Sequence, residues 1–327
     1  MEILHLFIIS LMPVLKVLLV ITVGLILATQ RFDLLGPDAR RHLNNMVFYV
    51  FYPALIGCSL AETMTLEGLA DLWFLPVNVL ISCIIGSVLG WILVKITKPP
   101  RHLWGLVISS CSAALCEEEN IAFGHASTCS ADGKAYASLS LAVSTFGKLK
   151  QSFMVIMRSN SLRKIFAPST IAAMIGFIIG IASPVRKIFI GDSAPLHVIY
   201  GFVELIGNAG IPSITLIVGA NLLKGLKGSG VGPCVVVGII IIRNVFLPIS
   251  GIGVVKAAKH LGLVELDPFY LFTLLLQYAI PPAMNIGTIS QMLGSGESEF
   301  SVIMLWSYGI AAVSLTFWIA CYLWLLG

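Results

Sequence analysis

Runs of about twenty apolar residues recur along the whole chain, separated by short charged loops. An α-helix of about this length crosses the hydrocarbon core of a bilayer. In lipid, every backbone polar group must be satisfied internally, which favours helices for such runs. Only 11% of the 327 residues are charged, against about a quarter in ordinary globular domains. The sequence therefore predicts an all-α polytopic membrane protein.

Ten segments fit this description and divide as five plus five. The predicted first transmembrane repeat covers residues 1–157, a short cytosolic linker covers 158–167, and the second repeat covers 168–327. The predicted segments are Leu6–Thr29, Asn44–Leu60, Leu72–Val94, Leu103–Leu115, Ala135–Met157, Pro168–Ile181, Val198–Leu223, Pro233–Val255, Leu271–Gln291 and Phe300–Leu326. The fourth is short, because its 13 residues make about 20 Å of helix against a core of about 30 Å.

The charges of the loops predict the orientation of the chain. Arg31, Arg40 and Arg41 follow the first segment, and further basic residues follow the third and fifth, whereas the loops after the second and fourth are acidic. Because cytoplasmic loops carry the excess of lysine and arginine, the odd-numbered loops are predicted to face the cytosol. The net charge of +4 is spread over these loops, so no nucleic-acid partner is expected. The tenth segment contains four aromatic residues expected to anchor it at the membrane interface: Trp306, Trp318, Tyr322 and Trp324.

The ninth segment, LFTLLLQYAIPPAMNIGTISQ, contains the most unusual feature of the chain. Pro281 and Pro282 remove two consecutive N–H donors, and their rings clash with the preceding turn. In lipid such a break persists only where protein or a watery cavity satisfies the freed carbonyls. Amide side chains flank the break, Gln277 before it and Asn285 after it. A broken helix lined by amides and hydroxyls is typical of a transporter's central site, and a packed proline kink is the alternative.

Three ionisable residues, Lys16, Glu204 and Arg243, lie inside apolar segments. A charge at the bilayer centre costs roughly 3 kcal/mol on insertion scales, so each is a candidate intramembrane charge site. For each residue, an ion pair that holds helices together is an alternative to a proton relay. The sequence contains no catalytic nucleophile–base arrangement, metal-ligand cluster or nucleotide-binding motif. We therefore predict no enzyme activity, catalytic residue, metal or cofactor.

Several runs of the sequence match one known family. They lie at Leu4–Arg31, Phe51–Ala61, Gly133–Val143, Ala167–Gly180, Ile190–Leu196, Thr215–Gly230, Leu276–Thr288 and Gly296–Trp306. These runs resemble the plant PIN-LIKES family, a branch of the auxin efflux carrier superfamily. The resemblance implies about ten transmembrane helices in two inverted five-helix repeats, with the fourth and ninth helices broken into crossovers. It also implies an intracellular carrier in the endoplasmic reticulum membrane that moves indole-3-acetic acid and regulates auxin homeostasis and signalling.

The resemblance places the double proline at the ninth-helix crossover. The N–H groups of the half-helix after the break, near Ala283–Ile286, would hold a carboxylate by hydrogen bonds and by the helix dipole. The substrate-binding residues implied in this way are Pro281, Pro282, Asn285 and Gln277. The expected partners are a small auxin carboxylate and the lipid bilayer, and a homo- or heterodimer with family members is left open.

The chain departs from the family pattern in its first half. Cys111–Leu115 passes directly into an acidic run, where the family continues through a Gly/Asn-rich break and a second apolar half-helix. The fifth segment contains Lys148 and Lys150, and the loop after it is short. We therefore expect the first-repeat crossover to be degraded. The alternative function is a truncated, transport-inactive membrane protein that acts through association with full-length relatives.

Overall fold

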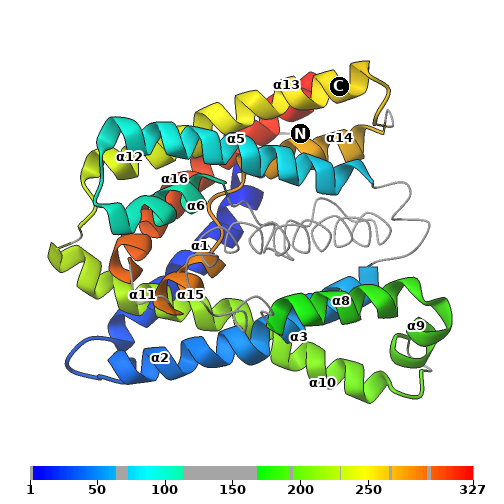
Figure 1. The fold of residues 1–327 in the computed structure, drawn as a ribbon, viewed down its shortest axis with the longest axis horizontal. Coiled ribbons are helices and arrows are strands. Elements are labelled where there is room, and N and C mark those ends of the chain that lie inside the picture. The colour runs from blue at the N-terminus through cyan, green and yellow to red at the C-terminus, as the bar shows by residue number, and fades with distance from the viewer. Residues whose placement is uncertain are drawn as a thin grey trace. The chain divides into compact units, whose positions relative to one another are not determined.

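The computed structural model describes residues 3–63, 73–112, 168–191, 194–228, 230–264, 267–292 and 296–326. Within these residues the regular elements are all helices (Figure 1), which confirms the predicted all-α class. The fifth predicted segment and the end of the fourth lie outside the described residues.

The chain folds into two compact units, each built from both halves of the sequence. Unit 1 contains the residues up to Asn44, the described ones from Ile81 to Ser112, and those from Ile214 onward. Unit 2 contains Asn45–Leu80 and the described residues from Pro168 to Ser213. The predicted division at residues 158–167 concerns internal repeats and stays a prediction.

The elements of the two units follow the predicted segments closely. In or entering unit 1 are α1 Ile3–Leu27, α2 Pro37–Met46, α5 Phe74–Thr97, η2 Arg101–Leu103, α6 Trp104–Ser112, α11 Gly210–Gly228, α12 Pro233–Ile241, η4 Ile242–Phe246, α13 Leu247–His260, α14 Pro268–Ala279, α15 Asn285–Met292 and α16 Glu297–Leu326. In unit 2 are η1 Val47–Phe51, α3 Tyr52–Thr63, α8 Pro168–Ile181, α9 Ser183–Phe189 and α10 His197–Asn208.

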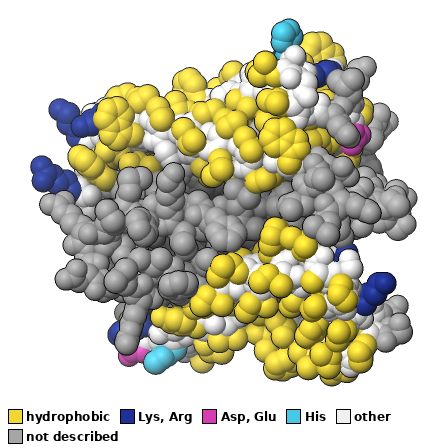
Figure 2. Space-filling view, turned by 45° about the vertical axis from the view of Figure 1, so that its right-hand side comes forward, with side chains coloured by type: hydrophobic (Ala, Val, Ile, Leu, Met, Phe, Trp, Pro, Cys, Tyr) yellow, Lys and Arg dark blue, Asp and Glu magenta, His cyan; other side chains and the backbone are white. Residues whose placement is uncertain are grey.

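Several of these helices have the length and apolar character of membrane spans. Among the described residues, four helical stretches qualify: Pro37–Glu62, Phe74–Thr97, His197–Gly225 and Pro233–His260. Two bent pairs raise the number to six if each pair is one span. Hydrophobic side chains cover most of the described surface in Figure 2, and basic side chains lie at its edges. This composition is the one expected for a polytopic membrane protein.

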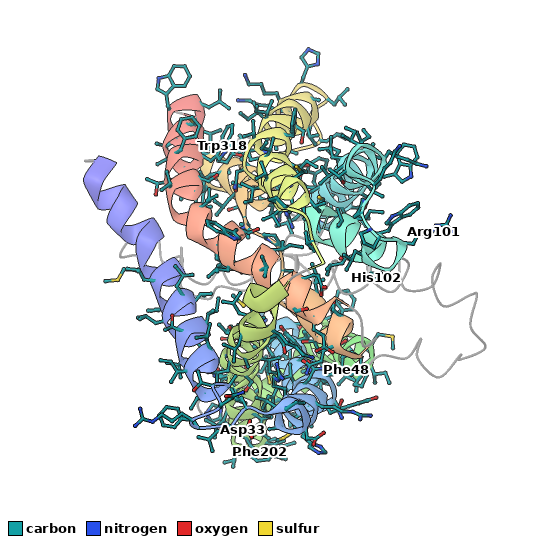
Figure 3. The ribbon with its side chains drawn as sticks, turned by 90° about the vertical axis from the view of Figure 1, so that its left-hand side faces the viewer. Asp33, Phe48, Arg101, His102, Phe202 and Trp318 are labelled. Carbon is teal, nitrogen blue, oxygen red and sulfur yellow. The ribbon has the colours of Figure 1, made fainter. Side chains whose placement is uncertain are left out.

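Among the described residues, two helices contain a π-helical segment that ends two residues before a proline. The segment η1 precedes Pro53 and η4 precedes Pro248. A proline cannot donate to the carbonyl four residues earlier, and its ring crowds that carbonyl, so a wider π turn relieves the clash. The carbonyl four residues before Pro248, that of Asn244, accepts a hydrogen bond of 2.7 Å from Nε1 of Trp318. This bond attaches α16, on which Figure 3 shows Trp318, to η4.

The location of Trp318 corrects one expectation from the sequence. Trp318 and Tyr322 were predicted to be interfacial anchors, but they are 8% and 0% exposed because they pack inside unit 1. Trp306 and Trp324 are exposed, at 56% and 85%, as an interfacial position requires.

A pair of glycines brings α5 and α6 close together. Gly86 and Gly90 are four residues apart on one face of α5, in the small-xxx-small spacing that lets membrane helices approach. A Cβ atom on Gly86 would lie 2.5 Å from the carbonyl oxygen of Cys111, and one on Gly90 would lie 3.1 Å from the Cα of Ile108. The two glycines therefore fix α6 against α5.

Candidate functional site

The ninth predicted segment is broken at the double proline. Helix α14 ends at Ala279 and α15 begins at Asn285. Ile280 is extended, with φ −71° and ψ 142°, as expected for a residue that precedes proline. At the other end of α14, the Asp267 carboxylate caps the helix by accepting from the N–H groups of the residues two and three positions later. The predicted break is confirmed, and it lies in unit 1.

The residues between the two half-helices are buried. Ala283 and Met284 are 2% and 3% exposed, and Met284 Sδ accepts a hydrogen bond of 3.3 Å from the Thr215 hydroxyl of α11. The N–H of Ile286 donates to the carbonyl of Ala283, and that of Gly287 donates to the carbonyl of Met284. The N–H groups of Met284 and Asn285 are not donors in these two hydrogen bonds.

The predicted substrate-binding residues lie on both sides of this turn. Gln277 is 3% exposed in the last turn of α14. Pro282 is buried and Pro281 is half-buried, while Asn285 is the first residue of α15. The four residues therefore flank one break in the backbone, at which Gln277 and Pro282 are buried. Their role in binding stays a prediction.

The half-helix α6 packs beside α15 and α12. Directly before it, in η2, Arg101 and His102 are exposed, whereas Ser110 and Ser112 of α6 are buried. Helix α6 thus runs from the surface of unit 1 into its interior.

A buried cation holds the inner end of α6. Nε of Arg243, which is 1% exposed on η4, donates to the carbonyl of Ser110 at 3.0 Å. This bond joins η4 to α6 within unit 1.

The three predicted intramembrane charges have different environments. Arg243 is buried in unit 1 as described above. Lys16 is exposed on α1, and Glu204 is exposed on α10 in unit 2. Neither Lys16 nor Glu204 forms an ion pair in the part of the chain that the structure describes. Their function stays a prediction.

The buried polar residues on α2 were not predicted from the sequence. Arg40 was assigned to a solvated loop, but it is 8% exposed because α2 begins at Pro37 and packs Arg40 against α11. Its Nη1 donates to Oδ1 of Asn221 at 2.7 Å and to the carbonyl of Ala220 at 3.3 Å. One turn later, Nδ2 of Asn44 donates to the carbonyl of Thr288 on α15 at 3.3 Å. The spacing of four residues was a readable signal for a shared helix face.

These features define a polytopic helical membrane protein with a buried, broken helix, the class of membrane transporters. A family described as "Membrane transport protein" matches residues 9–116 and 114–319. Protein PIN-LIKES 1 of Arabidopsis thaliana is 43% identical over 382 positions, covering 99% of this chain and 81% of the relative. Protein PIN-LIKES 3 of the same plant is 42% identical, covering 99% of each, and Protein PIN-LIKES 4 is 39% identical, covering 99% and 100%. The chain belongs to the PIN-LIKES family of the auxin efflux carrier superfamily, which confirms the resemblance seen in the sequence.

The comparisons also bear on the short fourth segment. The two matched segments meet at residues 114–116, where the sequence leads us to expect the loss of a half-helix. The alignment with PIN-LIKES 3 runs over 386 positions although this chain has 327 residues, so it contains positions at which this chain has no residue. Residues 113–167 lie outside the described ones. The state of the first crossover therefore stays a prediction.

Proposed function

We propose that the chain is an intracellular carrier of indole-3-acetic acid in the endoplasmic reticulum membrane, where it regulates auxin homeostasis and signalling. The buried break between α14 and α15 carries this proposal, because it is the described feature best suited to receive a carboxylate. Membership of the auxin efflux carrier superfamily supports auxin as the substrate.

The carboxylate would bind at the beginning of α15. Within the described residues the N–H groups of Met284 and Asn285 donate to no backbone carbonyl, and they lie at the positive end of α15. Because the neighbouring residues are buried, hydrogen bonds to a charged group are stronger there than in water. Pro281 and Pro282 keep the preceding backbone out of the helix, so these donors are not consumed by an upstream turn. Gln277 and the side chain of Asn285 are the proposed additional ligands.

Arg243 supports an anionic substrate. It lies in unit 1 on η4 and donates to the backbone of α6, which packs beside α15. A buried guanidinium raises the electrostatic potential of its surroundings and opposes the binding of cations. Lys16 and Glu204 are too exposed to share this role, and a function in proton transfer would have to be tested separately.

A second candidate is a transport-inactive protein that associates with full-length relatives, as a homo- or heterodimer. The interruption of the family match at residues 114–116 favours it. A carrier of this architecture uses half-helix ends from both repeats, so the loss of one crossover would remove part of the site.

The test is accumulation of radiolabelled indole-3-acetic acid in cells that express the intact chain, Pro281→Ala or Asn285→Ala. Lys259→Ala, at an exposed position on α13, is the matched control. Protein amounts in the endoplasmic reticulum fraction are equalised by immunoblot. The proposal expects changed accumulation with the intact chain and the control, and loss of the change in both site variants. The second candidate would be established instead if the intact chain left accumulation equal to that of empty cells, and if inserting a second apolar half-helix after Leu115 changed it.

A further inference from the structure

Arg40 is a buried cation that lacks a counter-charge among the described residues. It is 8% exposed on α2, and within the described part of the chain no carboxylate lies within ion-pair distance of it. Burial of an unpaired charge is unfavourable, and buried charges in proteins are normally paired. The guanidinium therefore has an unfilled requirement for an anion.

The unused part of the guanidinium is the part that recognises oxyanions. Nη1 is the nitrogen that donates to described residues, namely Asn221 and Ala220. Nε is buried and has no hydrogen-bond partner in the described residues. The Nε and Nη2 groups form the edge on which arginine holds a carboxylate through two parallel hydrogen bonds. Asn221 thus fixes the orientation of Arg40 and leaves this edge available.

Other buried polar atoms nearby are also unpaired. Asn44, one turn from Arg40 on α2, is 1% exposed, and its Oδ1 has no partner in the described residues. The hydroxyl of Thr288, whose carbonyl accepts from Asn44, is likewise buried without a partner there. Native proteins satisfy nearly all buried polar atoms with protein groups, water or ligands. We name Arg40, Asn44, Asn221 and Thr288 the α2 polar cluster.

The α2 polar cluster is close to the proposed substrate site along α15. Thr288 follows Asn285 by three residues, which corresponds to about 5 Å along the helix axis. Arg40 lies near the beginning of α2, and the loop before this helix, which contains Arg31, is predicted to face the cytosol. A carboxylate that moves between the cytosol and the start of α15 would therefore pass it.

We propose that the α2 polar cluster is a second carboxylate site, in which the Nε/Nη2 edge of Arg40 holds the acid before or after it occupies the start of α15. The inference rests on the proposed function, because it takes the same carboxylate as its ligand. The planar carboxylate matches the planar guanidinium edge. The burial of Arg40, which is 8% exposed, favours a small acid over a lipid headgroup.

The experiment measures equilibrium binding of tritiated indole-3-acetate to the purified full chain in nanodiscs of phosphatidylcholine alone. Arg40→Gln removes the charge and the edge, and Arg40→Lys keeps the charge without the planar edge. Arg41→Gln makes the same charge change at the exposed neighbouring position and is the matched control. We expect affinity to fall about tenfold in Arg40→Gln, to fall less in Arg40→Lys, and to remain unchanged in the control. Melting temperatures of the four proteins establish that the variants are folded, and Arg40→Lys serves as the test if Arg40→Gln is not.

The variant Asn285→Ala separates this inference from the proposed function. Binding that depends on Asn285 but is equal in the Arg40 and Arg41 variants would overturn the inference and leave the proposed function intact. Binding that depends on Arg40 but not on Asn285 would support the α2 polar cluster and refute the site at α15. Absence of carboxylate binding to the intact chain would overturn both. A final arm adds phosphatidylserine to the nanodiscs. Arg40-dependent stabilisation by this lipid, without Arg40-dependent binding of the acid, would identify a headgroup site and overturn the proposal.

Discussion

The hydrogen bond between Trp318 and Asn244 allows a quantitative test of the relation between proline and the π segment. Because Pro248 has no N–H, the Asn244 carbonyl loses its α-helical donor, and the indole of Trp318 supplies a replacement at 2.7 Å. Trp318→Phe keeps a large aromatic side chain but removes that donor. Pro248→Ala restores an N–H four residues after Asn244. The two changes should therefore compensate each other.

The expected energies follow from the burial of the bond. Hydrogen bonds between membrane helices contribute about 0.6 kcal/mol on average and at most about 1.7. Trp318 is 8% exposed, and Pro248 has no N–H to offer this carbonyl, so the bond should lie at the upper end of that range. With the lost indole volume added, we expect Trp318→Phe to reduce stability by about 2 kcal/mol in the intact chain. In the Pro248→Ala background the loss should fall to about 1 kcal/mol, a coupling energy of about 1 kcal/mol.

The assay is reversible unfolding of the four proteins of this double-mutant cycle in mixed micelles, followed by tryptophan-independent far-UV circular dichroism. Trp324→Phe, at an 85% exposed position in the same helix, is the control and should change stability by less than about 0.5 kcal/mol. Equal losses from Trp318→Phe in both backgrounds would show that Asn244 gains no donor from residue 248. That outcome would refute the explanation of the π segment.

Three further predictions concern stability. Gly86→Ala places a Cβ against a backbone carbonyl of α6 and should destabilise the protein by at least about 2 kcal/mol. Gly105→Ala, whose Cβ meets no atom within 4 Å, should be neutral or stabilising by up to about 1 kcal/mol, and thermal unfolding compares the two. Asp267→Ala removes the amino-terminal cap of α14 and should lower the free energy of unfolding by about 1 kcal/mol in the same assay. An unchanged stability would contradict the capping interaction. Arg186→Ala removes a 2.7 Å hydrogen bond to the last turn of α3 and should increase proteolysis of unit 2, whereas the exposed neighbour Lys187→Ala should not. Equal proteolysis of the two variants would contradict a stabilising role for the bond between Arg186 and the Glu62 carbonyl.

The parts of the fold that could be predicted are those determined by local chemistry. The sixth predicted segment, Pro168–Ile181, is helical throughout as α8, because an apolar run in a membrane satisfies its backbone polar groups as a helix. The break at Pro281 and Pro282 was predictable for a similar reason, since consecutive missing donors end a helix regardless of its neighbours. Composition identified the membrane class in the same local way.

The parts that could not be predicted depend on which neighbour covers a side chain. Arg40 was interpreted as a loop charge, because loop composition does not reveal that α11 packs over this side of α2. Trp318 and Tyr322 have the residue types of interfacial anchors, yet the packing of α16 against η4 buries them. Hydropathy indicates which segments lie in the membrane, but it does not indicate which side of each helix packs against other helices. Polar residues four positions apart therefore merit examination even where their charge already has an explanation.

The two functional hypotheses make different demands on unit 1. The proposed carboxylate donors at the beginning of α15, together with Arg243 and Arg40, all belong to unit 1 and are present in the described residues. The expected defect concerns the residues after α6, and the remaining donors do not depend on it. Loss of the first crossover should therefore impair movement of the acid across the membrane more than its binding. We expect the intact chain to bind indole-3-acetate under both hypotheses, but to change the accumulation of the acid only under the first. Binding and accumulation measured on the same preparation therefore distinguish an active carrier from an auxin-binding partner of full-length relatives.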